Sequence, residues 1–408
     1  MTISYNVLPE APLDPIMQAG VQWATMKQEH DDPVNTTVGV LLDPDDGSVW
    51  RPRTVKIALS RVDIDQPPEY GYQRQAGNAA FLTGMSSLVF GEALQSKLDG
   101  DVLGVQALGG TGALALANET LSVLKSHNRG SRVPLLLDDG WPNHRAIFAR
   151  DFKVTAPTRS SDRAQNHHLM MEAITKAAPR SVVLLQACGY NDDGIDRSQH
   201  QWDELLELIS EKDLPVIIDT AYLGLANGLE ADRYAIEQSV RMGLLTFVAA
   251  SASKNMGLYN ERVGALFVAN SRVKLGDEQH RRLGQAMDKI VRRTYSSPPL
   301  LGAKAVGLML NSYRRVDYQR ELTAAQAHLT STREQLADTL GDDFDFVRNG
   351  RGLFTRLLPN GFSKEQQGFL RQAGILTLPN SRINIGGIAP SQIHRVGSTI
   401  LEAIRQVT

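Results

Sequence analysis

Residues 251–264, Ser-Ala-Ser-Lys-Asn-Met-Gly-Leu-Tyr-Asn-Glu-Arg-Val-Gly, lie between two apolar runs at 244–250 and 265–268 that predict buried strands. Burial lowers the pKa of a lysine such as Lys254 and makes its amine a nucleophile toward a carbonyl. The serine hydroxyls and the arginine suit a phosphate. An aldehyde cofactor with a phosphate is pyridoxal phosphate. The alternative is an exposed lysine in a polar loop.

The chain around this stretch alternates short apolar runs with helical patterns from about residue 76 to 268. This alternation predicts an α/β fold, with a mostly parallel sheet that carries helices on both faces. Ligands in such sheets bind beyond the carboxyl ends of the strands. The apolar runs are Val102–Leu108, Val133–Leu137, Val182–Leu185, Val216–Ile218, Leu245–Ala249 and Ala265–Val268.

The length, composition, net charge and cysteine count limit the class of protein. A chain of 408 residues exceeds the size of a single core, so we expect two domains, with a smaller α+β domain near the C-terminus. The hydrophobic content of 42%, the charged content of 22% and the net charge of −2 are those of a soluble globular protein, with no sign of a nucleic-acid or membrane partner. The single cysteine excludes an internal disulfide and a Cys-based zinc site, and we expect no metal.

The localisation is expected to be cytoplasmic. The first 15 residues do not resemble a signal peptide, and no apolar run approaches the ~20 residues of a membrane span.

A glycine-rich loop follows the first run. Leu108-Gly-Gly-Thr-Gly-Ala-Leu-Ala115 opens a helix, where backbone N–H groups of Gly110 and Thr111 could hold a phosphate. The same residues satisfy a loose dinucleotide fingerprint, but the acidic residue expected about 20 positions later is missing. We favour the phosphate site, and a dinucleotide dehydrogenase remains the other interpretation.

Polar residues also follow other runs. Asp219 ends the fully apolar run 216–218, and a buried carboxylate needs a cationic partner such as a protonated pyridine nitrogen. Tyr222, three residues later, could reach the phenolic oxygen of the cofactor. Trp141 could stack on a flat ring. Asn191 could donate to a phenolate oxygen, although Asn, Asp and Gly are also ordinary turn residues.

Three further residues carry little signal alone. His144 is by itself an ordinary polar residue. Arg382 and Arg292 could each bind a carboxylate with two parallel hydrogen bonds, although each is also a plausible structural arginine.

Together these residues resemble the fold-type I aminotransferases, specifically the aspartate and aromatic amino acid aminotransferase family, from about Leu13 to the C-terminus. The motifs that carry the resemblance are Leu108-Gly-Gly-Thr-Gly-Ala-Leu114, Trp141-Pro-Asn-His-Arg145, Asp219-x-Ala-Tyr222, Ser253-Lys-Asn255, Gly257-Leu-Tyr-Asn-Glu-Arg-Val-Gly264 and Ser381-Arg-Ile-Asn384.

The resemblance implies a homodimer with shared active sites, and amino acid and 2-oxo acid substrates. It implies a large cofactor-binding domain over 48–313. Residues 1–47 and 314–408 would form a small domain that closes over the substrate and excludes water.

The resemblance also implies a role for each residue. Lys254 would form the Schiff base with the cofactor and then act as general base. Asp219 would pair with the ring nitrogen, with His144 behind it, and Trp141 would stack on the ring. Arg382 would bind the substrate α-carboxylate. Tyr222 and Asn191 would bond the phenolic oxygen, Arg292 of the partner subunit would bind a distal carboxylate, and the phosphate would be held by Gly110, Thr111, Ser251, Ser253, Arg262 and Tyr70 of the partner subunit.

Two departures from the family bear on the substrate. Where the family usually has His-Asn-Pro-Thr-Gly, this chain has Tyr190-Asn-Asp-Asp-Gly194, which places two acids near the site and should disfavour a dianionic substrate. Thr37 replaces a glycine of the substrate-lining loop, and a β-branched residue there narrows the pocket.

The function expected is therefore a pyridoxal-phosphate-dependent exchange of amino groups between a dicarboxylic or aromatic amino acid and a 2-oxo acid. The alternatives are a lyase or decarboxylase on the same cofactor, and a ligand-binding protein without catalysis.

Overall fold

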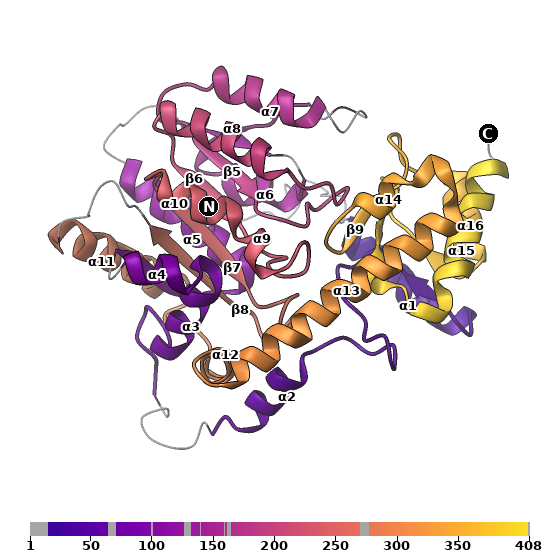
Figure 1. The fold of residues 1–408 in the computed structure, drawn as a ribbon, viewed down its shortest axis with the longest axis horizontal. Coiled ribbons are helices and arrows are strands. Elements are labelled where there is room, and N and C mark those ends of the chain that lie inside the picture. Colours follow the sequence, from indigo (N-terminus) through magenta and orange to yellow (C-terminus); the bar gives the residue numbers. More distant parts are fainter. Residues whose placement is uncertain are drawn as a thin grey trace, which may run out of the picture.

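A seven-stranded sheet lies at the centre of the computed structural model, which describes residues 15–63, 71–98, 101–125, 132–138, 140–158, 160, 165–269 and 277–406 (Figure 1). The strand order is β2-β8-β7-β6-β5-β3-β4. β8 runs antiparallel to β2 and β7, and the other neighbours are parallel, so the expected mostly parallel sheet is confirmed. The strands are β2 (Val102–Leu108), β3 (Val133–Leu137), β4 (Phe152–Thr155), β5 (Val182–Gln186), β6 (Val216–Asp219), β7 (Thr246–Ser251) and β8 (Val263–Ala269).

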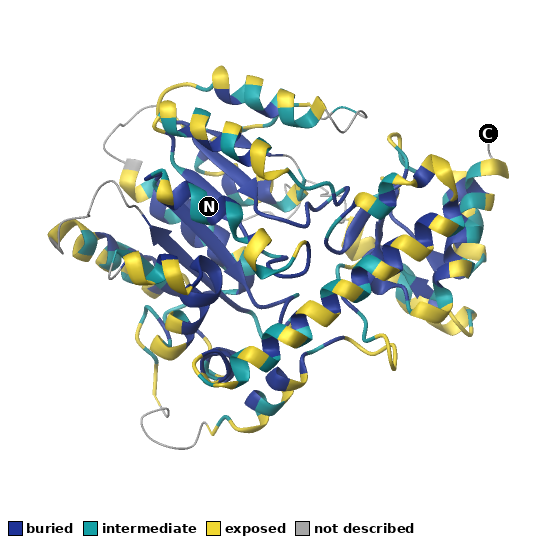
Figure 2. Ribbon diagram, viewed as in Figure 1, coloured by how far each residue is buried: buried dark blue, intermediate teal, exposed yellow. Residues whose placement is uncertain are grey.

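Successive residues of the inner strands pack on opposite faces of the sheet, as a pleated strand requires. In β5, Val183 and Leu185 belong to one apolar core, whereas Val182 and Leu184 belong to another. The first core is covered by α3 (Ala79–Phe90), α4 (Glu92–Leu98), α7 (Gln165–Thr175), α8 (Gln199–Glu211), α10 (Tyr234–Arg241) and α12 (Leu301–Leu310). The second is covered by α5 (Gly109–Lys125), α6 (Pro142–Phe148) and α11 (Asp277–Thr294). Figure 2 shows the sheet as buried and the outward faces of these helices as exposed.

A third core lies outside the central sheet. It gathers apolar side chains from Val34 and from residues 336–403, and the latter are drawn in orange and yellow on the right of Figure 1. Two small sheets accompany it, a parallel pair of β1 (Val34–Asn35) with β10 (Ile375–Leu376) and an antiparallel pair of β9 (Phe354–Arg356) with β11 (Arg382–Asn384). Its helices are α14 (Phe346–Asn349), α15 (Lys364–Gln372) and α16 (Ile393–Gln406).

One long helix joins the first and third cores. α13 (Arg314–Leu340) contributes Leu322 to the first core and Leu336 to the third. Between these two side chains lies Arg333, which is fully buried and donates to backbone carbonyl oxygens of residues 347–354. The described residues also form the α-helices α1 (Pro15–Glu29), α2 (Arg53–Ser60) and α9 (Leu229–Asp232) and the short 3-10 helices η2 (Asp342–Phe344), η3 (Ile385–Gly387) and η4 (Pro390–Gln392).

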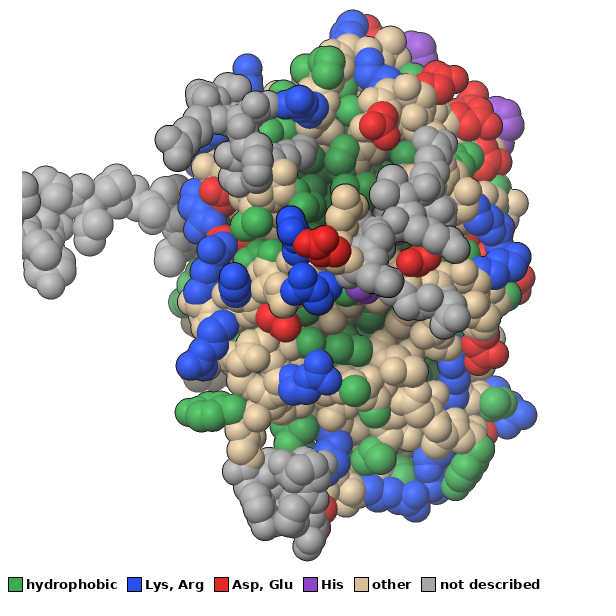
Figure 3. All heavy atoms as spheres, turned by 90° about the vertical axis from the view of Figure 1, so that its left-hand side faces the viewer, with side chains coloured by type: hydrophobic (Ala, Val, Ile, Leu, Met, Phe, Trp, Pro, Cys, Tyr) green, Lys and Arg blue, Asp and Glu red, His purple; other side chains and the backbone are tan. Residues whose placement is uncertain are grey.

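None of the described helices has the length and apolarity that a membrane crossing needs. Figure 3 shows charged and apolar side chains interspersed on the face that lies on the α11 side of the molecule.

Candidate functional site

A cleft of about 570 Å³ opens at the carboxyl ends of the parallel strands. Asp219 is the last residue of β6, Lys254 follows β7 by three residues, and Thr111 lies in the first turn of α5. The sheet therefore brings these separate motifs to one edge, as the order of the elements predicts. The predicted residues that line the cleft are Gly110, Thr111, Trp141, Asn191, Asp219, Tyr222, Ser251, Ser253, Lys254 and Arg262.

A buried carboxylate, Asp219, lines this cleft, and a buried imidazole lies behind it. Asp219 Oδ2 lies 2.8 Å from Nε2 of His144, which is fully buried, and Asp219 Oδ1 accepts a hydrogen bond from the backbone N–H of Ala221 at 3.0 Å. Trp141 meets the His144 ring edge-on, with the ring centroids 5.1 Å apart. Among the described residues, no lysine or arginine forms an ion pair with Asp219. Asp219 is only 7% exposed, and a carboxylate buried to this degree needs a cationic partner, so it suits the protonated nitrogen of a ring bound in the cleft.

Lys254 lines the same cleft, with Nζ 5.1 Å from the centroid of the Tyr222 ring. Burial lowers the pKa of Lys254 below its ordinary value; the negative charge of Asp219 opposes this shift, and the positive charges of Arg262 and Arg382 reinforce it. Burial also raises the pKa of the Tyr222 phenol, so that it stays protonated and can donate. A lysine with a lowered pKa beside a neutral phenol is suited to covalent capture of a carbonyl.

The end of the cleft at α5 is built for an anion. Arg262 has φ +52° and donates to the Tyr259 carbonyl oxygen at 2.9 Å and to Ser253 Oγ at 3.4 Å. Gly109 has φ +69°, a backbone conformation that favours glycine, and it lies beside the Arg262 guanidinium: a Cβ there would be 2.6 Å from Nη2. A guanidinium, serine hydroxyls and the N-terminus of α5 therefore surround one space, which fits a phosphate.

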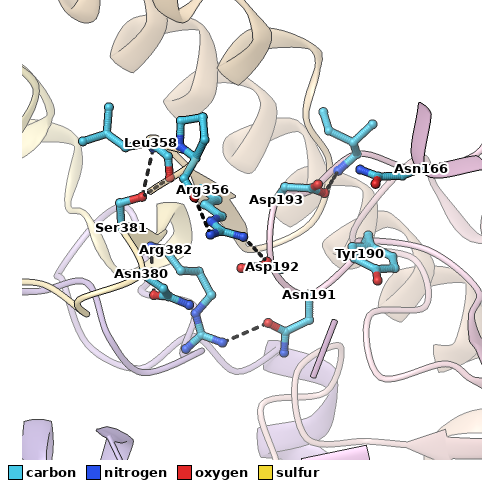
Figure 4. Close-up of polar contacts among 12 residues, drawn as sticks. Asn166, Tyr190, Asn191, Asp192, Asp193, Arg356, Leu358, Asn380, Ser381 and Arg382 are labelled. Atoms are coloured by element: carbon cyan, nitrogen blue, oxygen red, sulfur yellow. Dashed lines mark hydrogen bonds and ion pairs between the residues drawn. The ribbon is translucent and has the colours of Figure 1, made fainter. Parts of the chain in front are cut away.

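Arg382 forms the other end of the site. It begins β11, is 5% exposed, and its carbon Cζ lies 4.1 Å from the centroid of the Phe354 ring. Nη1 donates to Asn191 Oδ1 at 2.9 Å, as Figure 4 shows, and Nη2 donates to the Thr37 carbonyl oxygen at 3.0 Å. Asn191 in turn donates through Nδ2 to Tyr222 Oη at 3.4 Å. One hydrogen-bonded chain thus joins the arginine to the phenol.

Thr37 contributes its backbone rather than its side chain. The hydroxyl donates to Asn35 Oδ1 at 2.7 Å, and the side chain is fully buried and is not part of the cleft lining. Its φ is not positive. The threonine hydroxyl therefore fixes the loop from which the Thr37 carbonyl holds Arg382.

The two acids of the turn after β5 also have partners of their own. Asp192 Oδ2 accepts from Arg356 Nη1 at 3.2 Å, and Asp193 Oδ1 accepts from the backbone N–H of Ile195 at 2.9 Å. Neither side chain lines the cleft. Asp192 and Asp193, which the sequence places near the site, thus bond to groups outside the cleft.

Of the described predicted residues outside the cleft lining, His144 contacts Asp219 and Arg382 contacts Asn191, whereas Arg292 has no such contact. Arg292 is exposed on α11, where its guanidinium donates to Ser296 Oγ. Tyr70 lies outside the described residues. Since both were expected from a partner subunit, a single chain leaves that expectation untested.

The cleft also has lining residues that the sequence did not single out. Tyr259 lies within the stretch 251–264 and accepts from the backbone N–H of Leu41 at 2.9 Å, so its position in the motif was an available signal. Arg51 also lines the cleft, and its Nε donates to the Gly257 carbonyl oxygen at 3.0 Å. The residues around Arg51 in the sequence form no motif, so the sequence offered no signal for it.

Comparison with known proteins agrees with this arrangement. The family model for aminotransferase class I and II matches residues 38–400. An aspartate aminotransferase of Pseudomonas aeruginosa is 31% identical over 98% of this chain and 99% of its own length, and an aromatic-amino-acid aminotransferase of the same organism is 31% identical over 96% of each. The crystal structure of an aromatic-amino-acid aminotransferase from Burkholderia pseudomallei, covalently bound to pyridoxal phosphate, has a TM-score of 0.89 at 28% identity and covers 99% of this chain and 100% of that one.

Proposed function

The chain belongs to the class I and II aminotransferases, and from this premise we propose that it exchanges an amino group between a dicarboxylic or aromatic amino acid and a 2-oxo acid. It has the fold of these enzymes, and its cofactor is pyridoxal phosphate. The observation that carries the proposal is the position of Lys254 in one cleft with the buried Asp219–His144 pair.

When bound, the cofactor supplies a carbonyl that takes up the amino group and a ring that accepts electrons. Lys254 is the residue that we propose to hold it covalently and to carry the proton during exchange. Asp219 keeps the ring nitrogen protonated, and His144 orients Asp219 from behind. Trp141, which lines the cleft, would cover the ring. Tyr222 and Asn191 bond the ring oxygen, and the phosphate is held by Gly110, Thr111, Ser251, Ser253, Arg262 and Tyr70 of the partner subunit.

Arg382 is proposed to bind the substrate α-carboxylate, because its planar guanidinium matches a carboxylate with two parallel hydrogen bonds. Its contacts with Asn191 and the Thr37 carbonyl set its direction before substrate arrives. Arg292 of the partner subunit is proposed to bind a distal carboxylate in a homodimer with shared sites. The exposure of Arg292, away from the cleft of its own chain, supports that proposal.

We propose the domain division expected from the resemblance, with 48–313 as the large domain and 1–47 with 314–408 as the small domain that closes over the substrate. The separate third core, built from Val34 and residues 336–403, supports this division. We also place the enzyme in the cytoplasm. A single, buried cysteine among 408 residues is in keeping with a reducing compartment.

The visible absorbance of the purified protein tests the function. We expect a cofactor band that aspartate, tyrosine or phenylalanine bleaches and that a 2-oxo acid restores. A band that no amino acid changes would contradict amino-group exchange and favour a lyase or a binding protein. Absence of any band after incubation with pyridoxal phosphate would contradict the cofactor site itself.

A further inference from the structure

Two arginines face each other across the small antiparallel sheet. The register of β9 with β11 places Arg356 directly opposite Arg382. Directly opposite residues in an antiparallel pair project from the same face of the sheet, with their Cβ atoms roughly 5 Å apart. Like charges in such a pair repel each other, so the sheet needs an acceptor for each guanidinium.

Consecutive residues of the turn after β5 supply these acceptors. Asn191 Oδ1 accepts from Arg382 at 2.9 Å, and Asp192 Oδ2 accepts from Arg356 at 3.2 Å. Figure 4 shows the two arginines reaching from the sheet to the two turn residues. The other nitrogen of Arg356, Nη2, donates to the Pro359 carbonyl oxygen at 2.7 Å, which fixes the guanidinium beside the turn.

Asp192 carries a negative charge, whereas Asn191 is neutral, so only Asp192 forms an ion pair with its arginine. The side chain of Asp192 is 15% exposed and that of Arg356 is 33% exposed, so water screens their ion pair only in part.

We propose that Asp192 and Arg356 are positioning residues for the α-carboxylate site: their ion pair neutralises Arg356 and ties β9 to the turn, so that Arg382 keeps its place on Asn191. This inference rests on the proposed role of Arg382. The α-carboxylate is common to every amino acid and 2-oxo acid substrate. Loss of the pair should therefore weaken aromatic and dicarboxylic ligands alike.

The test measures ligand binding to the holoenzyme by calorimetry. 3-Phenylpropionate and succinate are suitable probes because they carry carboxylates but no amino group, and so bind without reacting. In Asp192→Asn and in Arg356→Met, we expect the Kd of both probes to rise about 2- to 5-fold, the size of a partly exposed ion pair. The swapped double variant Asp192→Arg with Arg356→Asp should recover most of the loss.

A matched control is Asp338→Asn, which removes a second ion pair, Asp338 Oδ1 with Arg348 Nη2 at 2.7 Å, from α13. Because Asp338 is 67% exposed and Arg348 keeps its pair with Asp345, this change should lower the melting temperature little, and it should leave both Kd values unchanged. An unchanged or lower Kd in Asp192→Asn, or no recovery in the swapped variant, would overturn the proposal. If the parent protein exchanges no amino groups and yet these Kd changes occur, the proposed function fails and the positioning pair stands.

Discussion

Asp219 ends β6 and Lys254 follows the neighbouring strand β7, whereas Arg382 belongs to a two-stranded sheet and is held by residues far away in the chain. We call the first group, with Arg262, the cofactor side of the cleft, and Arg382 with Asn191 and Thr37 the carboxylate side. The cofactor side is set by parallel strands whose carboxyl ends share one edge. The carboxylate side is set by contacts of Arg382 with Asn191, which lies 191 positions away in the chain, and with Thr37, which lies 345 positions away.

This difference separates the chemistry of the site from its choice of substrate. The carboxyl ends of these strands are rigid because every residue of β6 and β7 is buried. A side assembled from loops can change without disturbing that edge. Both departures from the family pattern, at Thr37 and at Asp192 with Asp193, lie on or next to the carboxylate side.

The largest effect should come from the cofactor side. Lys254→Ala removes the amine that holds the cofactor and carries the proton, and proton transfer by a positioned base alone contributes ~10²–10⁴-fold. We expect amino-group exchange to fall by at least about 10³-fold, measured with aspartate and 2-oxoglutarate, while the protein still binds pyridoxal phosphate non-covalently. The exposed Lys176→Ala is the control, and exchange retained in Lys254→Ala would rule out the mechanism.

A smaller effect should come from the carboxylate side, and it should not depend on the substrate. Arg382→Leu removes two charge-assisted hydrogen bonds, each worth about 1.5–3 kcal/mol. We expect kcat/KM to fall about 10²-fold or more for aspartate and phenylalanine alike, with the cofactor band unchanged. A loss confined to one of these substrates would show that Arg382 does not bind the α-carboxylate.

Arg292→Leu should act on one substrate class only. If Arg292 of the partner subunit binds a distal carboxylate, kcat/KM for aspartate falls about 10-fold or more, and that for phenylalanine changes little. The adjacent exposed Arg293→Leu serves as the control, since its guanidinium pairs with Glu119 of its own chain. Equal steady-state rates with aspartate for the variant and the parent would remove Arg292 from the site.

The smallest effect should be a shift in the pH midpoint of covalent cofactor binding by Lys254, which depends on charges from both sides of the cleft. Burial lowers the pKa of Lys254, the charge of Asp219 raises it, and those of Arg262 and Arg382 lower it. Apoprotein should therefore bind pyridoxal phosphate covalently with a pH midpoint below the ordinary lysine value of about 10.4. Arg382→Met should move this midpoint upward, because a cation is lost, and Asp219→Asn downward.

Absorbance at a series of pH values gives these midpoints. A parent midpoint at or above the ordinary lysine value, or shifts in the same direction for both variants, would contradict the coupling.

The sequence predicts the cofactor side well because each of its residues sits in a local motif at a strand end. The position of Asp219 after an apolar run, for example, fixes both its burial and its edge of the sheet. β4 was not among the predicted runs, since Phe-Lys-Val-Thr is short and half polar, and it lies at the edge of the sheet.

The carboxylate side is less predictable for a physical reason. That Arg382 bonds Asn191 depends on how β11 packs against the turn after β5, and no spacing in the chain records it. Asp192 is a second example. Its charge predicts repulsion of a dianionic substrate, but its contact with Arg356 depends on how β9 packs against the turn, which the sequence does not record. Arg51 and Arg356 gave no signal, because their neighbours in sequence are unremarkable for a surface segment.

α13 has a consequence for how the molecule melts. Its side chains belong to two apolar cores, and Arg333 between them has a pKa lowered by burial to about 9. If the third core unfolded alone, the second half of the helix would lose its packing, and this guanidinium would lose the carbonyl oxygens of residues 347–354. Heat denaturation of the chain should therefore be cooperative across both cores, with one calorimetric transition rather than two.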